Sequence, residues 1–98
     1  MYYVYLLVSL KTKELYIGYT NNLEKRLGAH NTNKSYSTKN KGPWIVVYCE
    51  MYKSKEDAKI REHRLKNYGQ ALNELKKRIT GSLSLANLVR EEVYKFGT

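Results

Sequence analysis

Five residues of this chain carry the groups that acid–base and phosphate chemistry requires. Two phenols, a guanidinium, an imidazole and a carboxylate can together hold a phosphodiester, activate a water molecule and bind a divalent cation. The first phenol closes the triplet Tyr-Val-Tyr, and the second opens the triplet Tyr-Ile-Gly ten residues later. The five residues are Tyr5, Tyr16, Arg26, His30 and Glu62.

The charge of the chain indicates a polyanion as partner. Eighteen Lys and Arg residues stand against nine Asp and Glu residues, which gives a net charge of +9. Residues 20–45 hold five basic residues and one acid, and residues 53–78 hold nine and four. The excess therefore lies in the segments that follow the two triplets, and nucleic acid is the expected polyanion. A basic surface that serves only solubility is the alternative.

Length and composition exclude several classes of protein. Ninety-eight residues are enough for one domain with a modest core. The single cysteine, Cys49, allows no intrachain disulfide and no zinc cluster, and its apolar surroundings predict a buried, inert thiol. The chain starts without a basic segment, and its first apolar stretch ends at Lys11, so neither a signal peptide nor a membrane span is expected. A cytoplasmic protein is predicted.

Three apolar runs predict three strands. Residues 2–10 and 15–20 are rich in aromatic and β-branched side chains and are separated by a polar turn, which predicts a hairpin with both triplets side by side. Residues 31–43 are polar and read as a loop. Residues 44–52 form a nine-residue apolar run, which we expect to be the central or the longest strand.

Helices are predicted between and after these strands. Asn21, followed three residues later by Glu24, resembles a capping box and predicts a helix that ends near residue 31. A second helix is expected from a cap in residues 54–57 to residue 68. Gly69 should interrupt it, and a third helix should end at Gly81.

A fourth, amphipathic helix is predicted over residues 84–96. Its apolar stripe could cover the core of its own chain or pair with another chain, as a homodimer or with a partner protein. The sequence thus predicts an α+β fold, with a small three-stranded antiparallel sheet flanked by helices, divided into a domain of residues 1–81 and an appended C-terminal helix of residues 82–98. The stripe consists of Leu85, Leu88, Val89, Val93 and Phe96.

These elements bring the candidate residues together. Tyr5 and Tyr16 fall on adjacent strands, so their phenols can share one face of the sheet. Gly18 near the strand end would allow a backbone or a phosphate to approach closely. Arg26 and His30 are four residues apart on one helix face. An imidazole with an ordinary pKa near ~6.5 would exchange protons near neutral pH.

Glu62 lies on the apolar stripe of its predicted helix. A carboxylate in such a place requires a nearby positive charge, because burial without a partner is costly. That charge could be a metal ion. It could equally be a structural ion pair with Arg61, Lys66 or Arg26, and the sequence leaves this open.

Over residues 2–79 the chain resembles the GIY-YIG nuclease superfamily, in particular its small single-domain bacterial members with Tyr-Val-Tyr in place of Gly-Ile-Tyr. The resemblance extends to the N-terminal domains of excision nucleases and so implies DNA repair. It implies active-site roles for Tyr5, Tyr16, Arg26 and His30. The family's metal-binding Glu matches Glu62, in the run Arg61-Glu62-His63-Arg64-Leu65-Lys66.

The resemblance also implies cofactors and contacts. One carboxylate implies a single Mg²⁺ or Mn²⁺ ion, completed by water and the substrate phosphate. A similar Tyr-Thr-basic stretch precedes the third strand in the family's small members. With the glycine of the second triplet, that stretch predicts the nucleic-acid contacts, which are Gly18, Lys34, Thr38, Lys39 and Lys41. Larger members also have an Asn after the Glu helix, but neither Asn67 nor Asn73 matches a motif here.

Three functions follow as hypotheses. The first is a metal-dependent endonuclease acting on DNA in preference to RNA. In it Tyr5, assisted by His30, activates water once nearby cations lower its pKa, and Arg26 and Tyr16 hold the phosphate. The second is a nucleic-acid-binding module without turnover. The third is an oligomerising basic protein organised by the tail helix.

Overall fold

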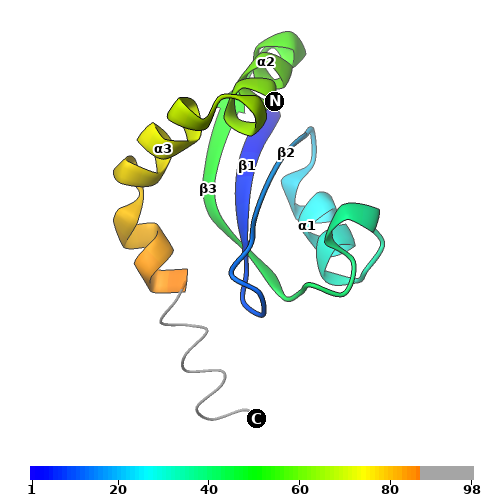
Figure 1. Ribbon diagram of the computed structural model, residues 1–98. Helices are drawn as coiled ribbons and strands as arrows, with labels where there is room; N and C mark the ends of the chain where they lie inside the picture. Colours follow the sequence, from blue (N-terminus) through cyan, green and yellow to red (C-terminus); the bar gives the residue numbers. More distant parts are fainter. Residues whose placement is uncertain (87–98) are drawn as a thin grey trace.

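A three-stranded antiparallel sheet forms the centre of the structure, a computed structural model that describes residues 1–86 (Figure 1). Its strands are β1 (Tyr2–Ser9), β2 (Leu15–Thr20) and β3 (Trp44–Tyr52), in the order β2-β1-β3. The prediction that residues 44–52 form the longest strand is confirmed. The central strand, however, is β1, which pairs with β2 on one side and with β3 on the other.

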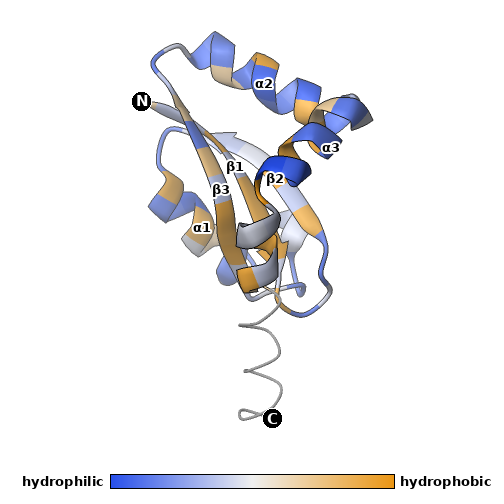
Figure 2. Ribbon diagram, turned by 90° about the vertical axis from the view of Figure 1, so that its left-hand side faces the viewer, coloured by the Kyte–Doolittle hydropathy of each residue, from blue (hydrophilic) through white to orange (hydrophobic). Residues whose placement is uncertain are grey.

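Each face of the sheet carries its own part of the core. On one face, Val4 and Leu6 of β1 pack with residues of the second and third helices, α2 (Lys55–Asn67) and α3 (Gly69–Arg78). On the other face, Tyr5 and Leu7 pack against the first helix, α1 (Leu23–Asn31). Figure 1 shows α1 and α3 on opposite sides of the sheet, and Figure 2 shows apolar residues concentrated along β1 and β3. The alternation of β1 side chains thus sends Tyr5 toward α1.

The pairing of β1 with β2 places the two triplets side by side, as predicted. Tyr5 lies opposite Gly18, and Leu7 lies opposite Tyr16. Directly paired residues in an antiparallel ladder point to the same face. Tyr5 and Tyr16 therefore share the α1 face of the sheet.

The caps of α1 and α2 follow local side-chain chemistry. The predicted cap at Asn21 is wrong by one residue, since the side-chain oxygen of Asn22 accepts the hydrogen bond from the Lys25 N–H at 3.0 Å. The predicted cap of α2 is confirmed at Ser54, whose hydroxyl accepts from the Asp57 N–H. These caps satisfy N–H groups that have no partner within the helix.

The break between α2 and α3 lies at Tyr68, whose extended backbone ends one helix and starts the other, while Gly69 is the first residue of α3. The predicted end at Gly81 is also displaced. The third helix ends at Arg78, a turn follows at Ile79, and residues 80–86 are helical again. Most of the amphipathic helix predicted for residues 84–96 lies outside the described residues, and the division of the chain at residue 81 stays a prediction.

The fold class is α+β, as predicted, with helices on both faces of a small antiparallel sheet. No helix within residues 1–86 combines the length and the apolar character needed to cross a membrane. Cys49 is a free, half-buried thiol, and burial, reinforced by the charge of Glu50, raises its pKa. This agrees with the prediction of an inert thiol.

Candidate active site

A hydrogen-bonded chain of three side chains lies between the sheet and α1. The Tyr5 hydroxyl is 3.0 Å from Nε2 of His30, and Nδ1 of His30 is 2.7 Å from the Thr38 hydroxyl. All three side chains are buried, and His30 and Thr38 have no exposed surface. Thr38 belongs to a short 3₁₀ turn (Tyr36–Thr38) that closes over α1. Buried polar groups that are all paired hold one another in fixed positions.

The tautomer of His30 sets the direction of these bonds. A guanidinium can only donate, so the Tyr5 oxygen accepts from Arg26. In the tautomer with the proton on Nδ1, His30 donates to Thr38 and the Tyr5 O–H donates to Nε2. In the other tautomer, Nε2 donates to Tyr5 and the Thr38 hydroxyl donates to Nδ1. The mechanism below uses the first tautomer.

Burial changes the proton affinities from those expected. It raises the pKa of Tyr5 to about 12, with smaller contributions from Tyr16 and Glu62, and outweighs the opposing effect of Arg26. Burial, together with the Arg26 charge, lowers the pKa of His30 to about 4. Two expectations are thus wrong for the free protein. Tyr5 is not acidified by its neighbours, and His30 does not titrate near neutral pH.

Gly18 provides the space for the Tyr5 ring. A Cβ atom at this position would lie 2.6 Å from Cζ of Tyr5 and 3.1 Å from Cε1 of Tyr16. The phenol therefore crosses over Gly18, from the central strand toward β2 at the edge of the sheet. The predicted contact between Gly18 and a phosphate is replaced by this packing, since the phenol fills the space above it.

Tyr16 and Arg26 complete the cluster. The Tyr16 ring centroid is 4.7 Å from the His30 ring and 6.2 Å from the Tyr5 ring. Burial lowers the pKa of Arg26, but hydrogen bonds to the hydroxyls of Tyr5 and Tyr16 outweigh it and produce a net rise. An Arg26 Nη also approaches the buried Ser35 hydroxyl at 3.5 Å. Four of the five predicted residues thus lie together.

Glu62 reaches the cluster around the edge of the sheet. The body of α2 packs on the face opposite α1, through residues such as Leu65. Nevertheless, Nζ of Lys66 lies 3.4 Å from the Glu62 carboxylate and 5.9 Å from the centroid of Tyr16. The Glu62 charge is close enough to contribute to the raised pKa of Tyr5. The partner that the sequence left open is Lys66.

Arg61 has a different partner, which anchors α2. Its Nε and one Nη lie 2.9 Å from the two carboxylate oxygens of Glu50 on β3, a two-point ion pair. The hydroxyls of Tyr48 and Tyr52 also donate to Glu50. Paired contacts of this kind fix orientation as well as distance. They hold α2, the helix that carries Glu62, against the sheet.

The loop residues predicted to bind nucleic acid differ in how exposed their side chains are. Lys34 and Lys39 are exposed. Lys41 is paired with Glu14 at 2.9 Å, with 42% of its side chain exposed. Thr38 is buried against His30 and has no surface for a phosphate. Its position indicates that it orients the imidazole.

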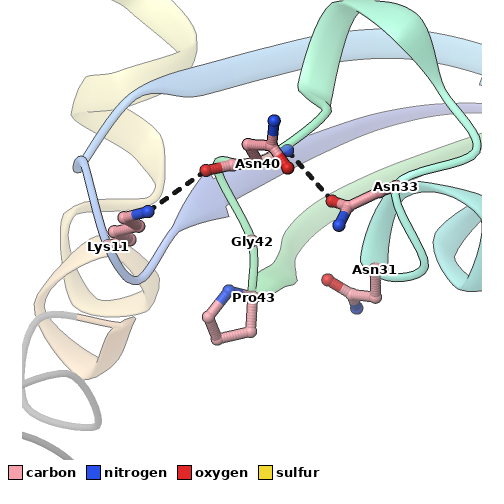
Figure 3. A pocket seen from close by; sticks show the side chains of 6 residues that line it. All are labelled: Lys11, Asn31, Asn33, Asn40, Gly42 and Pro43. Atoms are coloured by element: carbon pink, nitrogen blue, oxygen red, sulfur yellow. Dashed lines mark hydrogen bonds between the residues drawn. The ribbon is translucent and has the colours of Figure 1, made fainter.

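A polar hollow of about 550 Å³ lies between the turn that joins β1 and β2 and the loop that precedes β3 (Figure 3). The Lys11 ammonium donates to the Asn40 carbonyl, and the Asn40 N–H donates to the side chain of Asn33. Asn33 and Asn40 have positive φ angles of 61° and 65°, which asparagine tolerates better than most residues. Asn33 and Asn40 therefore stabilise the conformation of the loop.

The side chains fit a metal that the substrate helps to bind. No group of three His, Cys, Asp or Glu side chains that could enclose an ion exists within residues 1–86. Glu62 supplies one carboxylate, 19% exposed, and its present counter-charge is a flexible lysine. Mg²⁺ is commonly held by one or two carboxylates with water and substrate phosphates. The donor set fits that arrangement.

Sequence reasoning missed two roles. Lys66 was considered only as a structural partner, although it contacts both Glu62 and Tyr16. The link from Thr38 to His30 was missed because it joins residues eight positions apart through a loop. The spacing of Lys66 four residues after Glu62 is the one signal that could have indicated its position.

Comparisons with known proteins agree with this geometry. Residues 1–77 match the family model described as the GIY-YIG catalytic domain. A UPF0213 protein of Staphylococcus haemolyticus is 41% identical over 70 residues, which cover 70% of this chain and 84% of that protein. A UPF0213 protein of Clostridium perfringens is 45% identical over 67 residues, covering 67% and 71%.

The solution NMR structure of a UPF0213 protein from Bacillus halodurans is 32% identical and covers 78% of this chain and 86% of its own, with a TM-score of 0.47. The family match covers most of the chain and includes all five predicted residues. The protein therefore belongs to the GIY-YIG family.

Proposed function

We propose that this protein is a metal-dependent endonuclease that hydrolyses phosphodiester bonds in nucleic acid. The observation that carries the proposal is the bonded chain from Tyr5 through His30 to Thr38, with Arg26 beside it and Glu62 within electrostatic reach. A protein that only binds nucleic acid gains nothing from a carboxylate near its phosphate site. The preference for DNA over RNA rests on the similarity to excision nucleases.

Proton transfer in this site should be concerted. Burial raises the pKa of Tyr5 to about 12 and lowers the pKa of His30 to about 4, so moving the phenol proton to the imidazole before the reaction is unfavourable. The cost falls if Tyr5 receives a proton from water while its own proton passes to His30.

The reaction then proceeds as follows. A water molecule gives a proton to the Tyr5 oxygen, the phenol proton moves to Nε2 of His30, and the water oxygen attacks phosphorus. The bond from phosphorus to the 3′ oxygen breaks, and that oxygen takes a proton from solvent. The imidazolium of His30 then returns its proton to solvent, which restores the site. The negative charge that develops on the phosphate attracts the new positive charge on the imidazole, and this attraction favours the proton transfer.

Arg26 and Glu62 supply the electrostatic part. Arg26 has five N–H donors, so donors remain for phosphate oxygens after its bonds to Tyr5, Tyr16 and Ser35. Glu62 is the residue that would hold the divalent cation, which supplies positive charge for the phosphate and the leaving oxygen when bound.

A second candidate function is a nucleic-acid-binding module without turnover. The ion pair between Lys66 and Glu62 favours it, because the carboxylate already has a cationic partner at 3.4 Å. In that case Glu62 serves α2 alone, and a divalent cation has no effect on the protein.

The exchange Glu62→Gln separates the two functions. Cleavage of a panel of structured DNA and RNA substrates should fall by about two orders of magnitude or more, because the charge that binds the cation is lost. Affinity for nucleic acid should stay constant or rise slightly as a negative charge leaves. The matched control is Glu74→Gln, an exposed carboxylate of α3 paired with Lys77 at 3.4 Å.

The comparison is made with Mg²⁺ or Mn²⁺ and with EDTA. The endonuclease proposal requires cleavage by the wild type and by Glu74→Gln with metal, and little by Glu62→Gln or in EDTA. Equal cleavage by all proteins under all conditions would indicate a contaminating nuclease. The second candidate function, a binding module without turnover, would then remain.

A further inference from the structure

One side of α2 carries a lysine before and a lysine after Glu62. Lys55 precedes Glu62 by seven residues and Lys66 follows it by four, so all three project from the same side of the helix. The contact between Lys66 and the Tyr16 ring shows that this side faces the β2 edge. From the helical rise, Lys55 lies about 10 Å before Glu62 and Lys66 about 6 Å after it.

A cavity of about 430 Å³ lies at the amino-terminal end of α2. It is bounded by the start of β1 and the end of β2, and Figure 1 shows the N-terminus beside α2. Arg26 belongs both to the lining of the cavity and to the catalytic cluster, so the two are neighbours. The lining residues include two cations and no acid, and they are Tyr2, Tyr19, Thr20, Asn21, Arg26 and Lys55.

We propose that this side of α2 and the cavity bind the substrate strand on both sides of the bond that is cut. Lys66 contacts a phosphate on one side of the scissile phosphate. Lys55 contacts the phosphate of a nucleotide on the other side, which occupies the cavity, while Arg26, which also lines the cavity, contacts the scissile phosphate. The proposal rests on the proposed nuclease function and adds the position and direction of the strand.

Charge and volume support this placement. Lysine ammonium groups act as point charges toward phosphate, and those of Lys55 and Lys66 flank Glu62, the carboxylate on this side of α2. The cavity volume lies within the range of small-ligand sites. Tyr19 is half-buried, which leaves part of its ring available to a nucleotide sugar or base. The side chain of Lys66 is 44% exposed, so a phosphate can reach its ammonium group.

The test measures nucleic-acid affinity in EDTA, where no cleavage occurs and the pairing of Lys66 with Glu62 is not challenged by metal. The variants are Lys55→Gln and Lys66→Gln. The control is Lys77→Gln, which removes the same charge from the exposed pair with Glu74 on α3. Each test variant should bind roughly fivefold more weakly at 0.1 M salt and lower the log–log salt slope by about 0.7 to 0.9. The control should match the wild type.

Uncharged methylphosphonate linkages, placed one at a time along the oligonucleotide, then locate each contact. The loss caused by Lys55→Gln should disappear at one linkage and the loss caused by Lys66→Gln at another, because a removed contact cannot be lost twice. Wild-type cleavage products identify the scissile linkage, and the two positions should lie on opposite sides of it. The proposal is overturned if both variants behave as Lys77→Gln does, or if both couple to the same linkage.

Failure of the nuclease function would look different. A wild-type protein that binds nucleic acid but does not cut it would contradict the endonuclease proposal. If Lys55→Gln and Lys66→Gln each lost their effect at a different linkage in that protein, the strand would still be contacted by both lysines. A wild type that binds none of the oligonucleotides would overturn both proposals.

Discussion

The buried imidazole of His30 predicts that the protein loses stability between about pH 6.5 and pH 4. Burial, reinforced by the charge of Arg26, lowers the pKa of His30 from 6.5 to about 4 in the folded protein. The unfolded chain binds a proton near pH 6.5, so between these values it holds more protons than the folded protein. The free energy of unfolding therefore rises with pH across this window and falls as the pH drops through it.

The size of the effect follows from the two pKa values. Their difference corresponds to about 3 kcal/mol, absent above pH 6.5 and fully developed by pH 4. His30→Gln does not titrate, while its amide retains one donor and one acceptor for Tyr5 and Thr38. Urea unfolding of both proteins at pH 7 and pH 4 should show that the stability of the wild type relative to the variant drops by about 3 kcal/mol. Carboxylates titrate in both proteins, so their contributions cancel in the difference between the two unfolding free energies.

Parallel stability profiles of the wild type and the variant would refute this reasoning. A direct measurement is NMR titration of the imidazole in His63→Gln, which leaves His30 as the only histidine. A midpoint near 6.5 would show that His30 is hydrated, and the concerted proton transfer from Tyr5 would lose its basis.

Two further substitutions test the geometry around the phenol. Gly18→Ala should displace the Tyr5 ring and reduce cleavage by at least tenfold, with an unfolding transition that remains cooperative; wild-type activity would show that the ring does not lie over Gly18. Thr38→Val removes the partner of His30 Nδ1 while keeping the side-chain shape, and it should cost about 1–3 kcal/mol in urea unfolding. The exposed Ser37→Ala serves as its control, and equal stability of both variants would contradict the buried bond.

Most of the fold could be predicted because its signals are local. Apolar runs and turn residues gave the three strands, and Ser54 gave the start of α2. The errors arose where neighbouring positions offer the same chemistry. Asn21 and Asn22 can both cap α1, and only the backbone geometry selects Asn22. The central strand could not be chosen from residues 44–52, because an apolar run suits an edge strand that is partly covered as well as a central one.

The residue types of the site were predictable, but their proton affinities were not. Spacing and resemblance selected Tyr5 and His30 correctly as neighbours, and the structure places them 3.0 Å apart. The shifts in their pKa values come from the depth of burial, which depends on how the turn at Thr38 closes over α1. That closure is a tertiary contact without a period or motif. Sequence reasoning therefore gave His30 an ordinary pKa and expected cations to lower the pKa of Tyr5, whereas burial dominates both groups.

The resting charge pattern of the site links the two ligands that the proposed function requires. Lys66 lies 3.4 Å from Glu62, so under the proposed function a divalent cation held by Glu62 would compete with an ammonium group. Lys66 also lies 5.9 Å from the centroid of the Tyr16 ring, and a phosphate bound there would draw it away from the carboxylate. Since linkage is reciprocal, each ligand would then strengthen the binding of the other by the same factor. We therefore expect nucleic acid to raise the affinity for Mn²⁺, and Lys66→Gln to remove that coupling.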